Sequence, residues 1–313
     1  MVNNKYIAAE SDVGRKRNVD EDSVLVMEHL VGWKQHVHEI YEGERHPKGT
    51  EDKQTVLGAI VADGMGGHAR GEVASSMAIS TIREGIGNKI RNSSYFNDLQ
   101  NYENQVKKFT GLLAQQISKA NEEIFRNAEE NPDRQGMGTT ITGGLLISPP
   151  GKFIAANVGD SRTYIVRKKE GNNYEMEQVT RDHSAVQDLI EEGEIDPEEA
   201  EHPRSPKVER LSSQITRALG IGEGVEIDTF VKQVYKGDYI LVCCDGLTDM
   251  VPEKKIQDAV VKYDTVGKAT KELVRLANQY GGDDNISVAL IDTSRENIPK
   301  KEMIEEGDTQ IRR

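Results

Sequence analysis

The stretch TVLGAIVADGMGGHARGE, residues 55–72, decides the fold because it joins three kinds of local structure. Its first part, 55–62, is a near-continuous apolar run, which is typical of a buried strand. The run ends at Asp63, and a loop rich in glycine follows. From Gly71 onward apolar residues recur at helical spacing, which predicts a helix over 71–86. Either the loop is only a turn, or Asp63 holds a ligand that the glycines allow to approach closely.

Three further apolar runs also meet aspartates. FIAANVGD ends at Asp160, YILVCCD ends at Asp245, and NISVALI begins just after Asp283 and Asp284. Each run has the length and composition of a strand that is buried on both faces. If these strands lie side by side, the carboxylates at their ends can reach a common edge.

The order of strands and helices predicts packed sheets with helices outside them. Helical spacing predicts further helices over 103–130 and 266–280, and Pro252 suits the first turn of another. The strands come in hairpin-like pairs between these helices, because FIAANVGD leads into SRTYIVRK across a tight Gly-Asp-Ser turn. The motifs GxGxxG and GxxxxGK[ST] are both missing from the sequence, which argues against the common nucleotide-binding folds.

Composition narrows the class of protein. The 313 residues carry a formal charge of −13, from 40 basic and 53 acidic side chains, which argues against nucleic acid as a partner. The sequence has no apolar run of about 18 residues and does not begin like a signal peptide, so we expect neither a membrane span nor secretion. Cys243 and Cys244 are adjacent in an apolar run, which indicates a buried strand in a reducing compartment. These features predict a cytoplasmic protein.

One folded domain is expected over 1–293. A polar segment, about 28–54, lies between two predicted strands and is interpreted as a long hairpin insertion. Residues 294–313 have little apolar content, so we expect a flexible polar tail.

The aspartates that end the predicted strands imply metal chemistry. Bringing Asp63, Asp245 and Asp284 together would raise at least one pKa strongly unless cations neutralise the charges. Oxygen ligands without His or Cys favour Mg²⁺ or Mn²⁺ over Zn²⁺. Gly64 has no side chain to hinder its carbonyl from serving as a further ligand. Two such ions ~3.5–4 Å apart can share a hydroxide that attacks a phosphorus centre in line.

A phosphate-binding group is available in the segment GRKRNVDEDS. The guanidinium of Arg17 can fork onto two phosphate oxygens. Glu21 and Asp22 follow four and five residues later, and in an extended segment Arg17 and Glu21 would point to the same face. Taken alone, a charged loop explains RNVDEDS about as well.

Seven motifs in order give this chain a specific resemblance. They are SDVGRKRNVDEDS, DGMGGHARGEVAS, MGTT (137–140), NVGDSRTY (157–164), TRDHSAVQDLIEEGEI (180–195), CDGLTD (244–249) and GGDDNIS (281–287). From about residue 6 to 292 the sequence resembles the metal-dependent protein serine/threonine phosphatases of type 2C, especially their bacterial branch. The resemblance implies an α+β fold, a central β-sandwich of two mainly antiparallel sheets flanked by helix pairs.

The resemblance also implies a ligand set for two Mn²⁺ or Mg²⁺ ions. Asp63 would bridge the two metals, and Gly64 would give its carbonyl to one of them. Asp245 and Asp284 would complete the shell of the other metal. Glu21 would hold the second metal, directly or through water.

Further roles follow from the same resemblance. Arg17 would bind the substrate phosphate, and a hydroxide bridging the metals would attack it. Asp160 would help to bind a third, weaker metal together with Asp245. Residues from about 184 to 215 match a mobile flap beside the active site.

Two positions require a choice. Some members of the family carry a histidine directly after the Asp-Gly pair, where this chain has Met65, and His68 comes three residues later. Metal-bound water is therefore our first candidate for protonating the leaving oxygen, with His68 as the alternative. Of the pair Asp283 and Asp284, we choose Asp284 as the ligand because it directly precedes Asn285.

The function expected is hydrolysis of phosphoserine and phosphothreonine in proteins, opposing a Ser/Thr kinase. Two alternatives stay open: a metal-dependent hydrolase of small phosphate esters, and a non-catalytic regulatory module on the same fold. Thr309, in the acidic context EEGDTQIRR, is a candidate kinase target that would dock a phosphothreonine-binding domain.

Overall fold

A computed structural model describes residues 6–32, 53–66, 69–91, 101–171, 173–196, 211, 214–295 and 298. Its two five-stranded sheets are antiparallel throughout their strand pairs. The first, called the β11 sheet, has the order β1 (Ile7–Asp12), β12 (Ile286–Asp292), β11 (Tyr239–Cys243), β8 (Arg162–Lys168) and β9 (Tyr174–Gln178). The second, called the β3 sheet, has the order β10 (Asp228–Gln233), β7 (Lys152–Val158), β6 (Ile141–Ser148), β3 (Lys53–Ala62) and β2 (Ser23–Gly32).

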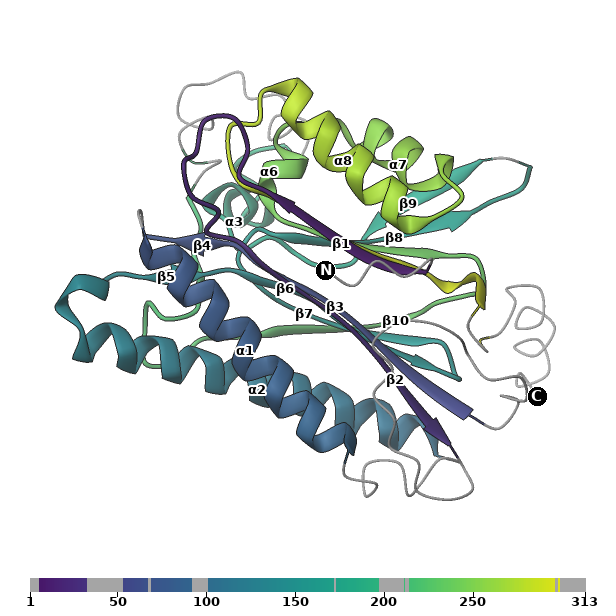
Figure 1. Ribbon diagram of the computed structural model, residues 1–313, viewed down its shortest axis with the longest axis horizontal. Coiled ribbons are helices and arrows are strands. Elements are labelled where there is room, and N and C mark those ends of the chain that lie inside the picture. Colours follow the sequence, from purple (N-terminus) through teal and green to yellow (C-terminus); the bar gives the residue numbers. More distant parts are fainter. Residues whose placement is uncertain are drawn as a thin grey trace.

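Helices cover the outer faces of the two sheets, which face each other across an apolar layer (Figure 1). The β3 sheet is covered by α1 (Ala69–Arg91) and α2 (Tyr102–Glu130), and the β11 sheet by α7 (Glu253–Lys262) and α8 (Val266–Tyr280). The shorter elements are β4 (Gly64–Met65), which pairs with β5 (Gly138–Thr139), together with η2 (Pro132–Arg134), α3 (Ala185–Glu191), α6 (Asp245–Thr248) and η3 (Thr293–Arg295). The predicted sandwich flanked by helix pairs is confirmed.

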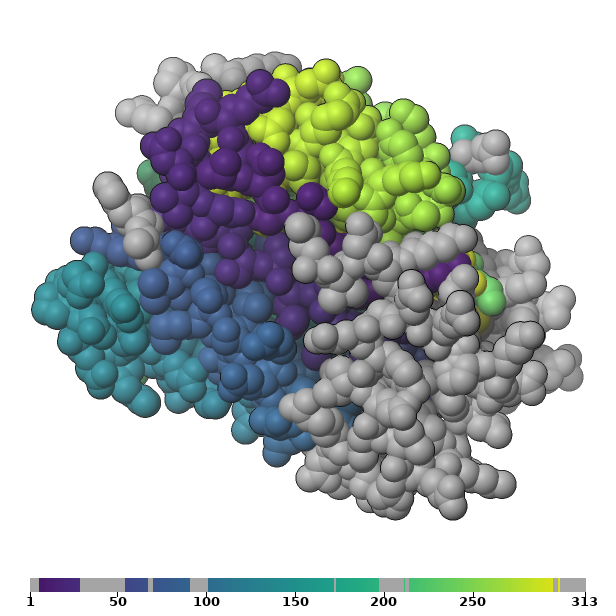
Figure 2. All heavy atoms as spheres, viewed as in Figure 1, coloured from purple at the N-terminus to yellow at the C-terminus, as the bar shows by residue number. Residues whose placement is uncertain are grey.

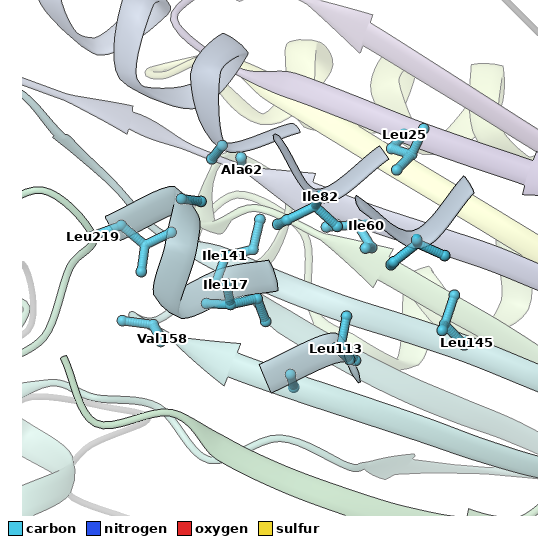
Figure 3. Close-up of a cluster of buried hydrophobic side chains, with 14 of the residues drawn as sticks. Leu25, Ile60, Ala62, Ile82, Leu113, Ile117, Ile141, Leu145, Val158 and Leu219 are labelled. Atoms are coloured by element: carbon cyan, nitrogen blue, oxygen red, sulfur yellow. The ribbon is translucent and has the colours of Figure 1, made fainter. Parts of the chain in front are cut away.

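Each central strand packs on both of its faces, which explains why its sequence lacks polar alternation. In β3, Ile60 points toward the helices and packs with Ile82 and Ile117 (Figure 3). The next residue, Val61, points into the layer between the sheets and belongs with Ile240 to a different cluster. A continuous apolar run is therefore compatible with antiparallel strands when the fold has four layers.

One expected hairpin is wrong. β7 and β8 are consecutive in the chain, yet they belong to different sheets, so the Gly-Asp-Ser turn crosses the sandwich. The hydroxyls of Thr142 on β6 and Thr163 on β8 lie 3.0 Å apart and link the sheets beside this crossover. A short connection between two apolar strands fits a hairpin and a crossover equally well, so the sequence could not separate them.

The N-terminal segment lies between the two helical layers on one face of the molecule. β1 and the loop after it pack against α8, and β2 runs beside α1 (Figure 2). In the expected insertion 28–54, β2 continues to Gly32 and β3 begins at Lys53, and the residues between lie outside the described part. Among the described helices, none combines the length and apolar content that a membrane crossing requires.

The packed core extends beyond the expected domain end at residue 293. Ile298 is only 7% exposed and belongs to the cluster between the sheets. It lies against Gly151, at the turn between β6 and β7. The remaining residues of the expected tail, apart from 294 and 295, lie outside the described part of the chain.

Candidate functional site

The candidate site is formed where two antiparallel strand pairs end, one pair from each sheet. In the β3 sheet, Asp63 follows β3 and Asp22 precedes β2, and these strands pair with Ser23 opposite Ala62. In the β11 sheet, Asp245 follows β11 and Asp284 precedes β12. Antiparallel pairing brings the end of one strand beside the start of its neighbour. Both sheets therefore deliver carboxylates to the same end of the sandwich.

The carboxylates of this cluster lie within interaction range of one another. The carboxyl groups of Asp63 and Asp245 lie close enough for each to shift the pKa of the other. Oxygens of Asp22 and Asp63 lie with the Cys244 sulfur within a span of 4.8 Å. Burial raises the pKa of Cys244 far above its usual range, so this thiol stays protonated and is a poor cation ligand.

Burial and mutual repulsion raise the pKa of several of these carboxyls. The pKa of Asp22 rises to about 7, first through burial and then through the charges of Asp20 and Asp245. Burial raises the pKa of Asp63 and of Asp245, with further contributions from neighbouring carboxylates. The surrounding protein therefore supplies too little positive charge to keep all of these carboxyls ionised at neutral pH.

Buried acceptors without donors show that the cluster fits divalent cations. Both carboxyl oxygens of Asp22 and Oδ1 of Asp245 accept no hydrogen bond from the described residues. Ser287 and Cys244 lie beside Asp22 and lower its pKa, although neither donates a hydrogen bond of strict geometry to it. Carboxylate and carbonyl oxygens are the ligands that Mg²⁺ and Mn²⁺ prefer.

Asp22 is the main residue that the sequence reasoning missed. The condition that the segment from Arg17 to Glu21 is extended is not met, because the chain bends at residues 18 and 19 and forms no strand there. Strand alternation therefore does not apply, and both Glu21 and Asp22 are buried, at 8% and 9% exposed. The signal available in the sequence was the run Asp20-Glu21-Asp22 directly before an apolar strand.

Arg17 reaches the cluster from the rim. Its Nη2 lies 2.6 Å from Oδ2 of Asp284, and the Arg17 side chain is about half exposed. The carboxylates of Asp284, Glu21 and Asp63 all raise the Arg17 pKa. Arg17 and Glu21 are thus neighbours, although the extended segment that suggested this is not formed.

The two adjacent aspartates before β12 point in different directions. Asp284 adds to the negative charge around Asp245, and its Oδ1 accepts the backbone N–H of Asn285 at 2.8 Å. Asp283 is exposed and pairs with Lys16 at 2.6 Å. This geometry agrees with the choice of Asp284 over Asp283.

Asn285 fixes the loop that carries Arg17 and Glu21. Its Oδ1 accepts the backbone N–H of Glu21 at 2.8 Å. Its Nδ2 donates to the carbonyls of Val13 and Val19, each at 2.9 Å. Because Asn285 is only 5% exposed, this anchor is shielded from water.

Thr139 and Thr140 hold the backbone of Asp63 from both sides. Its backbone N–H donates to Oγ1 of Thr140 at 3.1 Å. Its carbonyl accepts from the backbone N–H of Thr140 and from Oγ1 of Thr139, both at 2.8 Å. The Thr140 hydroxyl also lies 2.8 Å from that of Ser161, beside the Gly-Asp-Ser crossover.

Gly64 lacks a side chain for a reason beyond access to its carbonyl. A Cβ there would lie 2.3 Å from the carbonyl oxygens of both Glu21 and Gly71. The close approach of these backbones allows α1 to begin directly beside Asp63. Met65 pairs with Gly138 in the short β4–β5 ribbon, and His68 lies outside the described residues.

Asp160 lies at the edge of the cluster. Its pKa rises to about 8 through burial and through the charges of Asp245, Asp182 and Asp249. Asp182 is paired with Arg162 at 2.7 Å, whereas burial and Asp245 raise the pKa of Asp249 to about 6. Asp249 is a second acidic residue of this region that the sequence reasoning did not select.

Comparisons with known proteins agree on one family. The sequence pattern of the family described as Protein phosphatase 2C matches residues 49–286. A serine/threonine phosphatase stp from Listeria innocua is 37% identical over 243 residues, which is 77% of this chain and 86% of that protein.

Solved structures agree as well. The serine/threonine phosphatase PstP/Ppp of Mycobacterium tuberculosis is 31% identical with a TM-score of 0.68, covering 92% of this chain and 98% of that one. A catalytic domain of PstP in complex with two manganese ions is 30% identical with a TM-score of 0.66, covering 91% and 96%.

Proposed function

The chain belongs to the protein phosphatase 2C family, and we propose that its acidic cluster holds two Mn²⁺ or Mg²⁺ ions for hydrolysis of phosphoserine and phosphothreonine in proteins. Membership of this family makes the chain a metal-dependent protein serine/threonine phosphatase. One observation carries the assignment of the site. Buried carboxylates from both sheets converge there, and their pKa values are raised. Several of their oxygens accept no hydrogen bond from the described residues.

The residues divide into two overlapping ligand sets. Asp63 would be shared by both ions, with Glu21 and the Gly64 carbonyl completing one set. Asp245 and Asp284 would complete the other. When bound, the cations activate water for attack on phosphorus and offset the negative charge of the phosphoryl oxygens. Asp22, buried beside Asp63, adds negative charge that favours the binding of cations.

A third, weaker cation would take Asp160 and Asp245. Asp249 supports this part of the proposal, because its charge and that of Asp245 both raise the Asp160 pKa. Asp182 does not join this set, because Arg162 already pairs with it through Nε and Nη2.

Arg17 would orient the phosphoryl group. Its guanidinium is half exposed at the rim of the cluster, and its fork fits two phosphate oxygens. Its pairing with Asp284 holds the guanidinium beside a carboxylate that we propose as a metal ligand.

Hydrolysis assays test the proposal directly. We expect Mn²⁺-dependent hydrolysis of an aryl phosphate and faster hydrolysis of a phosphothreonine peptide. Asp63→Asn should lower kcat at least about 100-fold, since even indirect partners of a metal cost 10- to 100-fold. Asp283→Asn is the control, because that exposed aspartate pairs only with Lys16 among the contacts described.

Two outcomes would contradict the proposal. Full activity of Asp63→Asn would remove the two-ion assignment. A peptide rate no better than the aryl phosphate rate would favour a hydrolase of small phosphate esters. Any metal-dependent turnover excludes the non-catalytic module.

The cellular setting follows as a proposal from the same features. Relatives named serine/threonine phosphatases suggest phosphorylated proteins as substrates and a Ser/Thr kinase as the opposing enzyme. Cys243 and Cys244 are buried and free, as a protein of the reducing cytoplasm would have them. Thr309, the candidate docking site for a phosphothreonine-binding domain, lies outside the described residues.

A further inference from the structure

His183 is a buried imidazole that binds both backbone polar groups of one glycine. Its backbone N–H donates to the carbonyl of Gly159 at 2.9 Å. Its Nδ1 accepts the backbone N–H of the same glycine at 3.1 Å. The side chain is only 1% exposed, so water does not replace either bond.

The other ring nitrogen faces an ion pair. Because Nδ1 accepts a hydrogen bond, the ring proton is on Nε2, which lies 3.2 Å from Oδ2 of Asp228. The second oxygen of Asp228 accepts from Nη1 of Arg217 at 3.0 Å. Arg217 and Asp228 therefore hold the imidazole on the side opposite Gly159.

These residues also close the base of the segment 184–215. The carbonyl of His183 accepts the backbone N–H of Thr216 at 2.8 Å. Ala185 donates to the carbonyl of Gln214 at 2.9 Å, and Ser184 bridges to Ile215. The two ends of the segment are thus joined to each other at His183.

On its other side, His183 reaches the candidate metal site through the crossover turn. Gly159 directly precedes Asp160 and adopts a φ of 110°. A Cβ at Gly159 would lie 2.6 Å from the side chain of Thr140, which binds the backbone of Asp63. The turn therefore has little freedom to move without moving the residues around Asp63.

We propose that His183 is a positioning residue that ties the Asp160 turn to the base of the segment 184–215, and that it does so only as the neutral imidazole with its proton on Nε2. A proton on Nδ1 would face the N–H of Gly159 and remove its acceptor. The tie rests on these hydrogen bonds, whereas its effect on turnover rests on the function proposed for Asp160.

The surroundings of His183 favour its neutral form, which the proposed contact with Gly159 requires. Burial lowers the His183 pKa, and the cationic Arg217 and Arg181 lower it further. The carboxylate of Asp228 opposes them. The net shift is downward, which keeps the ring neutral at neutral pH.

Three substitutions in the full-length protein distinguish the hydrogen bond of Nδ1 with Gly159 from the contact of Nε2 with Asp228. His183→Asn places an amide oxygen where Nδ1 lies and can still accept from Gly159. His183→Gln reaches toward Asp228 with an amide donor but offers no acceptor at the Nδ1 position. His183→Ala removes both bonds. Urea unfolding of each variant first establishes that it folds.

The primary measurement is the amide of Gly159, by NMR shift and hydrogen-exchange protection. We expect protection to be kept in His183→Asn and lost in His183→Gln and His183→Ala. In the unsubstituted protein, acidification below the usual histidine pKa should reduce the hydrogen-exchange protection of this amide reversibly, and the reduction should be smaller in His183→Asn. Equal behaviour of the Asn and Gln variants, or an amide that ignores His183→Ala, would overturn the proposal.

Turnover of a phosphothreonine peptide with Mn²⁺ is the second measurement. His183→Ala and His183→Gln should lower kcat about tenfold with KM little changed, as loss of an indirect partner of a metal site does. His183→Asn should recover part of that loss. Lost Gly159 protection with an unchanged kcat would support the tie and overturn the role given to Asp160.

Discussion

At the scale of single residues, Arg17 and Lys16 show how position decides the role of a charge. Both cations pair with an aspartate at 2.6 Å, and the two aspartates are adjacent in sequence. Arg17 faces the buried carboxylates, whereas Lys16 and Asp283 form a surface pair. A surface pair of this kind contributes little to stability.

Replacing Arg17 tests its role in holding phosphate. Arg17→Ala should raise KM for a phosphothreonine peptide by about ten- to a hundredfold, since a hydrogen bond to a charged group contributes about 1.5–3 kcal/mol. The kcat should change much less. Steady-state kinetics check this, with Lys16→Ala as the matched control. An unchanged KM in Arg17→Ala would argue against contact with the phosphate.

At the scale of elements, the site depends on how closely α1 approaches the end of β3. Gly64 and Gly71 face each other, and a Cβ on Gly71 would lie 2.6 Å from the carbonyl carbon of Gly64. The hydroxyl of Ser75, one turn further along α1, donates to the carbonyl of Glu21 at 2.6 Å. The helix therefore supports both acidic segments of the β3 sheet.

The same substitution at two glycines should have opposite effects on stability. Gly64→Ala places a Cβ 2.3 Å from two carbonyl oxygens, so the backbone must shift, at a cost of about 1–3 kcal/mol. Gly111→Ala in α2 meets no atom within 4 Å and should stabilise by about 1 kcal/mol through helix propensity. Urea unfolding measures both. Equal stability of Gly64→Ala and the unsubstituted protein would contradict the close approach described.

At the scale of the whole molecule, the acidic cluster links folding to pH. Folding raises the pKa of Asp22 from 3.8 to about 7 and that of Asp160 to about 8. Between about pH 4 and 8 the folded protein therefore binds more protons than the unfolded chain, so this contribution to stability falls as pH rises. Cations bound to the carboxylates offset both causes of this loss, first the burial of the charged groups and then their mutual repulsion.

Metal should accordingly stabilise the protein more in mild alkali than in mild acid. We expect Mn²⁺ to raise Tm more at about pH 8 than at about pH 6, because protons compete for the same oxygens at the lower pH. Thermal unfolding with Mn²⁺ and with a chelator measures this. Asp22→Asn, which removes one buried charge, should raise the chelated Tm at the higher pH. An equal Mn²⁺ effect at both pH values would contradict the linkage.

The sequence by itself determined the elements and most of the acidic residues of the site. Strand and helix patterns are local, so the ends of β3 and β11 and the helix over 266–280 could be predicted closely. The strand ends also gave Asp63 and Asp245, because each acid directly follows or nearly follows its apolar run.

Only the tertiary structure decided how these elements combine. The crossover from β7 to β8, the burial of Asp22 and the anchors Asn285 and His183 all rest on contacts between segments far apart in the chain. Apolar periodicity shows which faces of an element are buried, but it does not say against what. In each sheet the end of one strand lies beside the start of its neighbour because the two are antiparallel, and the two strand pairs meet only when the sheets pack against each other.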